Sequence, residues 1–207
     1  MNIGPYSIED YMHMVKSFHG NIAPGLIIGG FMVDLARKEL PDEILFDAIC
    51  ETRTCLPDAV QLLTPCTIGN GWLKVMDFGR FALCLYDKYQ GDGVRVFLDS
   101  GKVENWPVIR DWFFKLKTRK EQDPNQLRDQ IIEAGPEILT VQKVSIDLSL
   151  LGKKGKGAIA TCPACREAYP AKDGPTCLAC QGNSPYRLDP SEPVREARPD
   201  LKIVTTD

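Results

Sequence analysis

Two Cys-x-x-Cys pairs near the C-terminus constrain this chain more than any other feature. Cys162 and Cys165 form the first pair, and Cys177 and Cys180 form the second. Each pair places two thiolates on one tight turn, and two such turns facing each other give the tetrahedral sulfur cage that suits Zn²⁺. Two disulfides or a redox dithiol are the alternatives. Disulfides need an oxidising compartment, which nothing in the sequence indicates, and a redox pair would lie between a strand and a helix. We therefore predict one structural zinc ion bound by these four cysteines.

The composition predicts one medium domain and one small domain. The chain has 207 residues, 43% of them hydrophobic, which is enough for a buried core. A run of glycine and lysine residues reads as a flexible linker, and the end of the chain is rich in proline and charge. We therefore predict an α+β core domain over 1–151, a linker over 152–157, a four-cysteine zinc-finger domain over 158–188 and a flexible tail over 189–207.

The predicted core is an antiparallel sheet packed with helices, followed by a small C-terminal zinc-ribbon-like module. Ser7 can cap a first helix, and Pro24 and Pro57 are placed to begin two more. Three strand-like runs separated by turns predict an antiparallel meander. The expected helices cover 8–18, 24–39, 57–63, 106–117 and 126–134, and the expected strands cover 72–76, 80–86, 94–98 and 139–146. Residues 44–51 read equally as a strand or a helix.

Charge and hydropathy predict a cytoplasmic protein without a membrane partner. The net charge of −3 gives no general attraction to nucleic acid or to an anionic membrane. The N-terminus has no basic segment followed by an apolar one, and no apolar run is long enough to span a bilayer. In such a compartment the eight cysteines read as metal ligands, reactive thiols or buried packing residues.

A second group of residues with chemical potential lies in the first seventy positions. His19 ends the first predicted helix, where it could simply act as a C-terminal cap. Cys55 immediately precedes the helix begun by Pro57, and a helix N-terminus lowers the pKa of a thiol, although Asp58 in the first turn opposes this. Cys66 lies beyond the other end of that helix, roughly 15 Å away at ~1.5 Å per residue. Cys55 and Cys66 would therefore share a metal only across a bent helix or between two chains.

Three ordered motifs in this region resemble the FmdE family, which is named after a component of formylmethanofuran dehydrogenase. They are the segments 18–25 (FHGNIAPG), 51–61 (ETRTCLPDAVQ) and 64–71 (TPCTIGNG). The resemblance runs to about residue 100 and implies an α+β core, in some members a C-terminal zinc finger, and a tightly intertwined homodimer. Formylmethanofuran chemistry itself belongs to molybdenum or tungsten pterin subunits, which nothing here resembles.

The chain departs from the family pattern at two positions of the first motif. The family usually has His-Gly-His-x-Cys-Pro-Gly, and here Asn21 replaces the second histidine and Ala23 the cysteine. His19, Cys55 and Cys66 remain as a reduced set for a core metal site, in which Asn21 could offer only a weak oxygen ligand.

We carry two main hypotheses for function from the sequence. The first is a zinc-binding accessory, regulatory or interaction protein, whose partner is a protein or, with weaker support, a nucleic acid. From Gly152 to Arg187 there are six basic residues and two acidic ones, a modest positive charge that the thiolates reduce further. The second is an enzyme that uses His19 and Cys55 as a metal- or thiol-dependent core site. A purely structural dimer module is a third reading, and whether the chain is an enzyme stays open.

Overall fold

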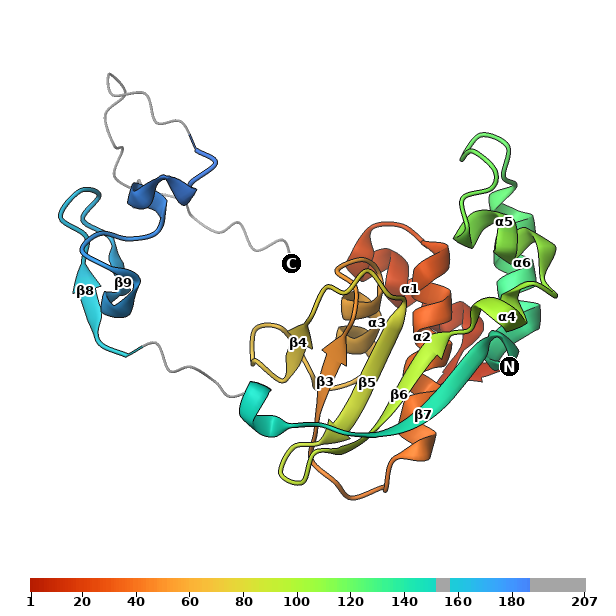
Figure 1. The fold of residues 1–207 in the computed structure, drawn as a ribbon. Helices are drawn as coiled ribbons and strands as arrows, with labels where there is room; N and C mark the ends of the chain where they lie inside the picture. The colour runs from red at the N-terminus through yellow and green to blue at the C-terminus, as the bar shows by residue number, and fades with distance from the viewer. Residues whose placement is uncertain (152–156, 187–207) are drawn as a thin grey trace, which may run out of the picture. The chain divides into compact units, whose positions relative to one another are not determined.

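The computed structural model describes residues 1–151 and 157–186 of the chain (Figure 1). The chain divides into two compact units, Met1–Leu151 and Gly152–Asp207. The linker predicted over 152–157 lies outside the described residues except for Gly157, and the predicted tail over 189–207 lies wholly outside them.

A five-stranded sheet in the order β4-β3-β5-β6-β7 forms the centre of the first unit (Figure 1). Its strands are β3 (Phe46–Cys50), β4 (Leu73–Val75), β5 (Ala82–Asp87), β6 (Asp92–Leu98) and β7 (Leu139–Ser145). The pairs β3–β5, β5–β6 and β6–β7 are antiparallel, whereas β3 and β4 are parallel. The predicted meander is therefore wrong at β4. The helix between β3 and β4 returns the chain in the same direction, so β4 joins the outer edge of β3 and does not pair with β5.

The helices of this unit are α1 (Ile8–His19), α2 (Pro24–Glu39), α3 (Leu56–Leu63), α4 (Ser100–Val103), α5 (Pro107–Phe113) and α6 (Pro124–Ala134). A short hairpin of β1 (Asn2–Ile3) and β2 (Tyr6–Ser7) precedes them, and the 3₁₀ turns η1 (Gly135–Ile138) and η2 (Leu148–Leu151) flank β7. Ser7 caps α1 by accepting a hydrogen bond from the Asp10 N–H. Among the described residues, no helix has the length and apolar character to cross a bilayer.

Helix α5 is shorter than predicted. The helix expected over 106–117 covers only Pro107–Phe113, and the chain turns at Lys115, whose φ is 55°. At the end of α1, Phe18 is 55% exposed. Tyr11 and Val15 are fully buried, so the apolar stripe of α1 ends one turn before the helix does.

Helix α2 lies in the middle of the core and contacts α3, β5 and β6. Every residue from Gly25 to Val33 is buried, as expected for a helix that is apolar all round. A Cβ placed at Gly29 would lie 2.8 Å from the Cβ of Ala59, and one at Gly25 would lie 2.8 Å from the sulfur of Cys55. Glycine is therefore required at both positions, because α3 approaches the backbone of α2 so closely.

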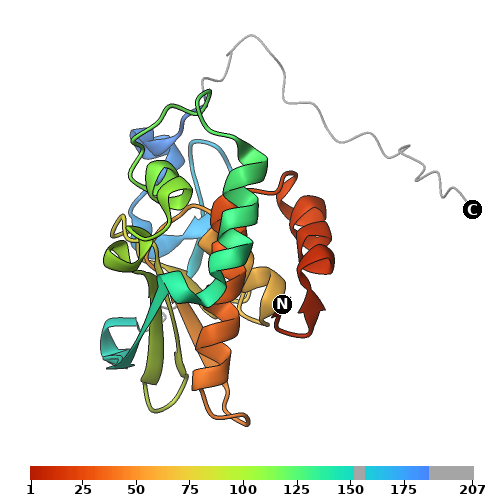
Figure 2. The same cartoon turned by 90° about the vertical axis from the view of Figure 1, so that its right-hand side faces the viewer.

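The sheet divides its side chains between two faces by simple alternation. One face carries Cys50, Leu83, Leu85, Val94 and Val96, which pack in the main core with α2. The other carries Ile49, Cys84 and Tyr86, which form a smaller cluster with Met76, Val144 and side chains from 146 to 151. Figure 2, turned by 90° from Figure 1, shows α1, α2 and α6 gathered on one side of the sheet. The overall class is α+β, as predicted.

The second unit is built from a hairpin and short helical turns. Strands β8 (Ile159–Thr161) and β9 (Ala168–Pro170) pair antiparallel, followed by η3 (Ala171–Asp173) and η4 (Ala179–Asn183). In its described part, the buried apolar cluster consists of Cys162, Tyr169 and Cys177, with Ala160 and Cys165 against them. So small an apolar cluster does not hold a fold together without a further cross-link.

Candidate functional site

The four cysteines of the second unit converge on one centre. The sulfur atoms of Cys162, Cys165, Cys177 and Cys180 all lie within 4.8 Å of one another, and those of Cys165 and Cys177 are 3.7 Å apart. Four sulfurs at ~2.3 Å from a tetrahedral ion would be about 3.8 Å apart. The donor set and its dimensions therefore fit Zn²⁺, and the predicted zinc ligands are the residues that meet here.

Local backbone geometry prepares this site for thiolates. The N–H groups of Cys165 and Cys177 point at the sulfur of Cys162 and lower its pKa to about 6. Hydrogen bonding with the side chains of Cys177 and Cys165 raises the pKa of Cys180 to about 12, because these contacts favour its protonated thiol. A bound divalent ion would favour the thiolate form of all four cysteines instead. Tyr169 is buried against the site and donates from its hydroxyl to the carbonyl of Gly174, 2.8 Å away, so it shields the sulfurs.

In the first unit, His19 pairs with the carboxylate of Asp58. The sequence placed this carboxylate near Cys55 but did not connect it with His19. Nδ1 of His19 lies 2.6 Å from Oδ2 of Asp58, and each side chain is about 30% exposed. Asp58 belongs to the first turn of α3, so His19 joins the end of α1 to the start of α3 and is not a free helix cap. With Nδ1 engaged, Nε2 is the ring nitrogen left for other chemistry.

Cys55 occupies a strained position immediately before α3. Its φ is 59° and its ψ is −55°, and the Leu56 N–H donates to the Thr54 carbonyl at 2.6 Å, which closes a γ-turn around it. A γ-turn with positive φ at its centre is rare and strained for a residue other than glycine. The predicted depression of the Cys55 pKa is wrong. Burial, and then the charge of Asp58, raise it. Desolvation of the half-buried sulfur and the charge of Asp58 outweigh the helix dipole.

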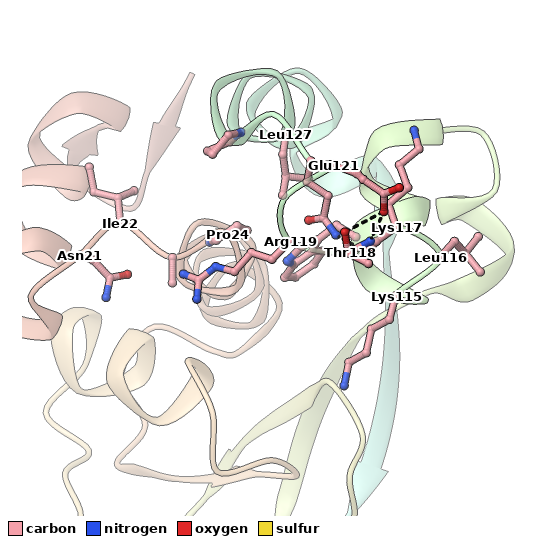
Figure 3. A pocket seen from close by; sticks show the side chains of 14 residues that line it. Asn21, Ile22, Pro24, Lys115, Leu116, Lys117, Thr118, Arg119, Glu121 and Leu127 are labelled. Carbon is pink, nitrogen blue, oxygen red and sulfur yellow. Dashed lines mark hydrogen bonds between the residues drawn. The ribbon is translucent and has the colours of Figure 1, made fainter.

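The two motif positions where the chain departs from its family pattern open onto a cavity of about 690 Å³ (Figure 3). Asn21 and Ala23 line one wall of it, and Trp112 and the loop 115–122 supply much of the rest. Three basic side chains and one acidic one reach this cavity: Lys115, Lys117, Arg119 and Glu121. Four basic residues lie within 115–120, and the helix predicted over 106–117 included only the first two of them.

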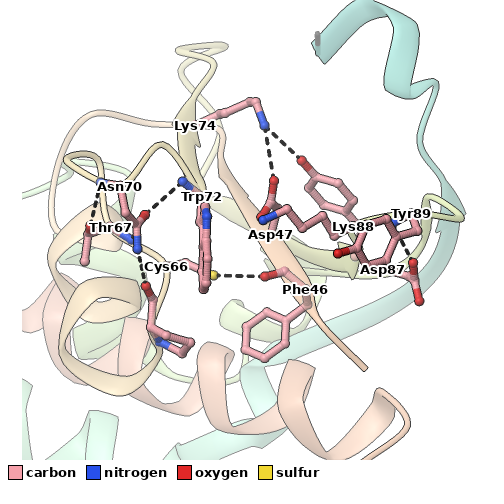
Figure 4. A network of polar contacts seen from close by, with 12 residues as sticks. Phe46, Asp47, Cys66, Thr67, Asn70, Trp72, Lys74, Asp87, Lys88 and Tyr89 are labelled. Carbon is pink, nitrogen blue, oxygen red and sulfur yellow. Dashed lines mark hydrogen bonds and ion pairs between the residues drawn. The ribbon is translucent and has the colours of Figure 1, made fainter. Parts of the chain in front are cut away.

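Cys66 lies apart from this region, in a loop that folds around Asn70 (Figure 4). Its thiol donates to the Phe46 carbonyl at 3.4 Å, it is fully buried, and burial raises its pKa to about 11. The Asn70 side chain holds the loop by accepting from the N–H groups of Thr67 and Trp72 and donating to the Pro65 carbonyl. Cys66 therefore closes the loop against β3. Within the described part of the chain, His19, Cys55 and Cys66 do not form a group with ligand atoms in reach of one ion.

A buried ion-pair network that the sequence did not reveal anchors the end of β3. Glu51 is 6% exposed and accepts two hydrogen bonds from Arg95, at 2.6 and 2.9 Å, while Arg80 lies 2.7 Å away. The hydrogen bonds from Arg95 hold the pKa of Glu51 below its usual value. The Glu51 carbonyl also accepts from the N–H groups of Phe78 and Arg80. Glu51 thereby fixes the strand end from which the chain enters the Cys55 turn.

Comparison with known families assigns both units. A family model described as "FmdE, Molybdenum formylmethanofuran dehydrogenase operon" matches residues 18–146. A second, described as "FmdE treble clef zinc finger", matches residues 153–187. The resemblance drawn from the sequence motifs and the predicted zinc binding are thus both confirmed, and the small module matches a treble clef.

Two individual proteins are similar to this chain. The crystal structure of a tungsten formylmethanofuran dehydrogenase FmdE-like protein from Syntrophus aciditrophicus is 60% identical, with a TM-score of 0.83 over 90% of this chain and 98% of that one. A curated relative from Archaeoglobus fulgidus, described as a probable S-adenosyl-L-methionine-binding protein, is 29% identical over 191 residues. The match covers 81% of this chain and 51% of the relative, so the chain spans about half the relative's length.

Proposed function

The chain belongs to the FmdE family and carries that family's zinc finger, and from this premise we propose that it is an accessory or regulatory protein that acts by binding a partner. One observation carries the proposal: in the first unit, side chains from the family motifs make contacts that hold the fold together. His19 binds Asp58 and Cys66 donates to the Phe46 carbonyl. Among residues 1–151 and 157–186, the four-cysteine site is the group of side chains arranged to hold a metal ion.

The proposal includes a homodimer whose two chains exchange elements, as the family resemblance implies. Its support in this chain is apolar surface beside a small groove on the second face of the sheet. Phe78 is 55% exposed and Leu150 is 81% exposed, and both line this groove with Met76 and Leu151. Each large apolar side chain gains ~1.5–3 kcal/mol when it is fully buried, which a second copy would provide. A monomer in light scattering at micromolar concentration would contradict this part of the proposal.

The partner that fits the zinc unit best is another protein. Of the two tyrosines that could stack on a nucleic-acid base, Tyr186 is 79% exposed, but Tyr169 is buried and hydrogen-bonded beside the sulfurs. Leu178 and Ile159 are 49% and 58% exposed, so the unit presents apolar side chains as well as its modest positive charge.

A comparison of core and zinc-site variants tests the accessory role. In a host strain that lacks the gene, the His19→Ala/Cys55→Ser variant should restore the lost phenotype, and its zinc content should stay at one ion per chain. The Cys177→Ser variant should lose zinc and fail to restore it. The proposal is wrong if the core variant fails while folded and zinc-loaded, or if Cys177→Ser restores the phenotype without zinc.

A thiol-dependent reaction at Cys55 is the second candidate, and the strained turn favours it. Backbone strain of this kind concentrates at functional sites, and the adjacent Asp58–His19 pair offers an oriented imidazole as an acid or base. If Cys55 is a nucleophile activated by the His19 imidazole, His19→Asn should slow its alkylation by iodoacetamide in a way that His13→Asn on α1 does not. Equal alkylation rates in both variants, and in the unmodified protein, would remove this candidate.

A further inference from the structure

The cavity beside Asn21 and Ala23 has a surplus of positive charge that the fold does not use. Of its basic side chains, Lys117 is paired with Asp111 at 2.7 Å. The acidic Glu121 accepts from the N–H and the hydroxyl of Thr118, at 2.8 and 2.7 Å, so its charge is directed into its own loop. Within residues 1–151 and 157–186, the side chains of Lys115 and Arg119 have no acidic partner. Figure 3 shows Arg119 extending from its loop towards Asn21 and Pro24 on the opposite wall.

Lys115 lies in a backbone position that would suit glycine better. The Leu116 N–H donates to the Asp111 carbonyl and the Lys115 N–H to the Trp112 carbonyl, which is the Schellman arrangement at the end of α5. The residue at the centre of this motif has positive φ and is usually glycine, yet here it is Lys115 with a φ of 55°. The backbone therefore gives no reason for a lysine here, and the side chain of Lys115 lines the cavity.

We propose that this cavity binds a small organic oxyanion, either a phosphate or a carboxylate. Lys115 and Arg119 recognise the charged group, because a guanidinium and an ammonium both donate to such oxygens. The apolar part of the ligand lies against Trp112, Leu116 and Leu127, which line the same cavity. Its volume of about 690 Å³ is within the range of ligand sites that enclose a molecule of nucleotide size. This ligand site is independent of the zinc unit and goes beyond the proposed accessory role.

Isothermal titration of the full zinc-loaded chain at low salt tests the site with two probes. Adenosine monophosphate represents the phosphates, and phthalate represents the carboxylates. We expect saturable binding of one probe, and the stronger of the two identifies the source of the oxyanion. Arg119→Gln should weaken that binding at least tenfold, which corresponds to the ~1.5 kcal/mol of a charge-assisted hydrogen bond.

Lys115→Gly separates a ligand role from a structural one. Because glycine suits the positive φ, this variant should unfold at the same temperature as the unmodified protein or higher, while its affinity for the probe falls about tenfold. Lys120→Ala is the matched control, since it removes one charge from the same loop but does not line the cavity. The proposal is refuted if neither probe binds, if Lys115→Gly binds as well as the unmodified chain, or if Lys120→Ala weakens binding equally.

Discussion

Replacing Glu51 with glutamine should destabilise the core unit severely, although the change removes only a charge. Glu51 is 6% exposed and faces two arginines of very different burial. The Arg95 side chain is 18% exposed and the Arg80 side chain is 59% exposed. Breaking a buried pair by removing one partner costs ~3–5 kcal/mol, whereas an exposed pair contributes ~0–1 kcal/mol. We therefore expect Glu51→Gln and Arg95→Met each to lower the free energy of unfolding by about 3 kcal/mol or more, and Arg80→Ala by about 1 kcal/mol or less.

Urea unfolding followed by tryptophan fluorescence measures the free energy of unfolding of the first unit. All three tryptophans, at positions 72, 106 and 112, belong to the first unit, so the zinc unit does not contribute to the signal. The double variant Glu51→Gln/Arg95→Met should lose less free energy than the sum of the two single variants, because neither charge is then buried alone. The reasoning fails if Glu51→Gln costs less than about 1 kcal/mol, or if Arg80→Ala costs as much as Arg95→Met.

The same pair predicts a dependence on pH. Hydrogen bonds from Arg95 lower the pKa of Glu51 in the folded state, so this contribution is complete above the unfolded value of ~4.3 and is lost as the pH falls through the folded value. The stability gap between the unmodified protein and Glu51→Gln should therefore be constant from about pH 6 to 7 and should narrow below about pH 4. A gap that stays unchanged in acid would contradict the assigned cause.

Three further changes give clear expectations. Cys177→Ser should release the zinc ion and unfold the second unit alone. Metal analysis should show the loss of zinc, and the tryptophan fluorescence of the first unit should stay native. Retention of zinc would show that the ligand set is wrong. Cys55, which is half-buried, should react with iodoacetamide faster than Cys50 or Cys84, because burial raises the pKa of each of those two to about 12; peptide mapping measures the order, and equal rates would refute it. Gly25→Ala should lower the free energy of unfolding by ~1–3 kcal/mol, since its Cβ would lie 2.8 Å from the Cys55 sulfur. Cys55→Gly in the same chain should restore part of this loss. The absence of any rescue in urea unfolding would count against this contact.

The sequence alone was sufficient for the zinc site, because its chemistry is local. Four cysteines within nineteen positions, in two turns, can face each other in few ways, and no distant segment is needed to complete the cage. The start of α2 at Pro24 and the cap of α1 at Ser7 were likewise readable, since each depends on a neighbouring residue and the helix that follows.

Tertiary structure decided what depends on residues far apart in the chain. The parallel pairing of β3 with β4 follows from the crossover through α3, which periodicity cannot reveal. His19 and Asp58 are separated by 39 positions, and Glu51 and Arg95 by 44, so only the packing of helices and strands brings each pair together. At Cys55 the dipole of α3 predicted a lowered pKa, yet burial and the Asp58 charge raise it, because desolvation depends on what the rest of the fold places around the sulfur.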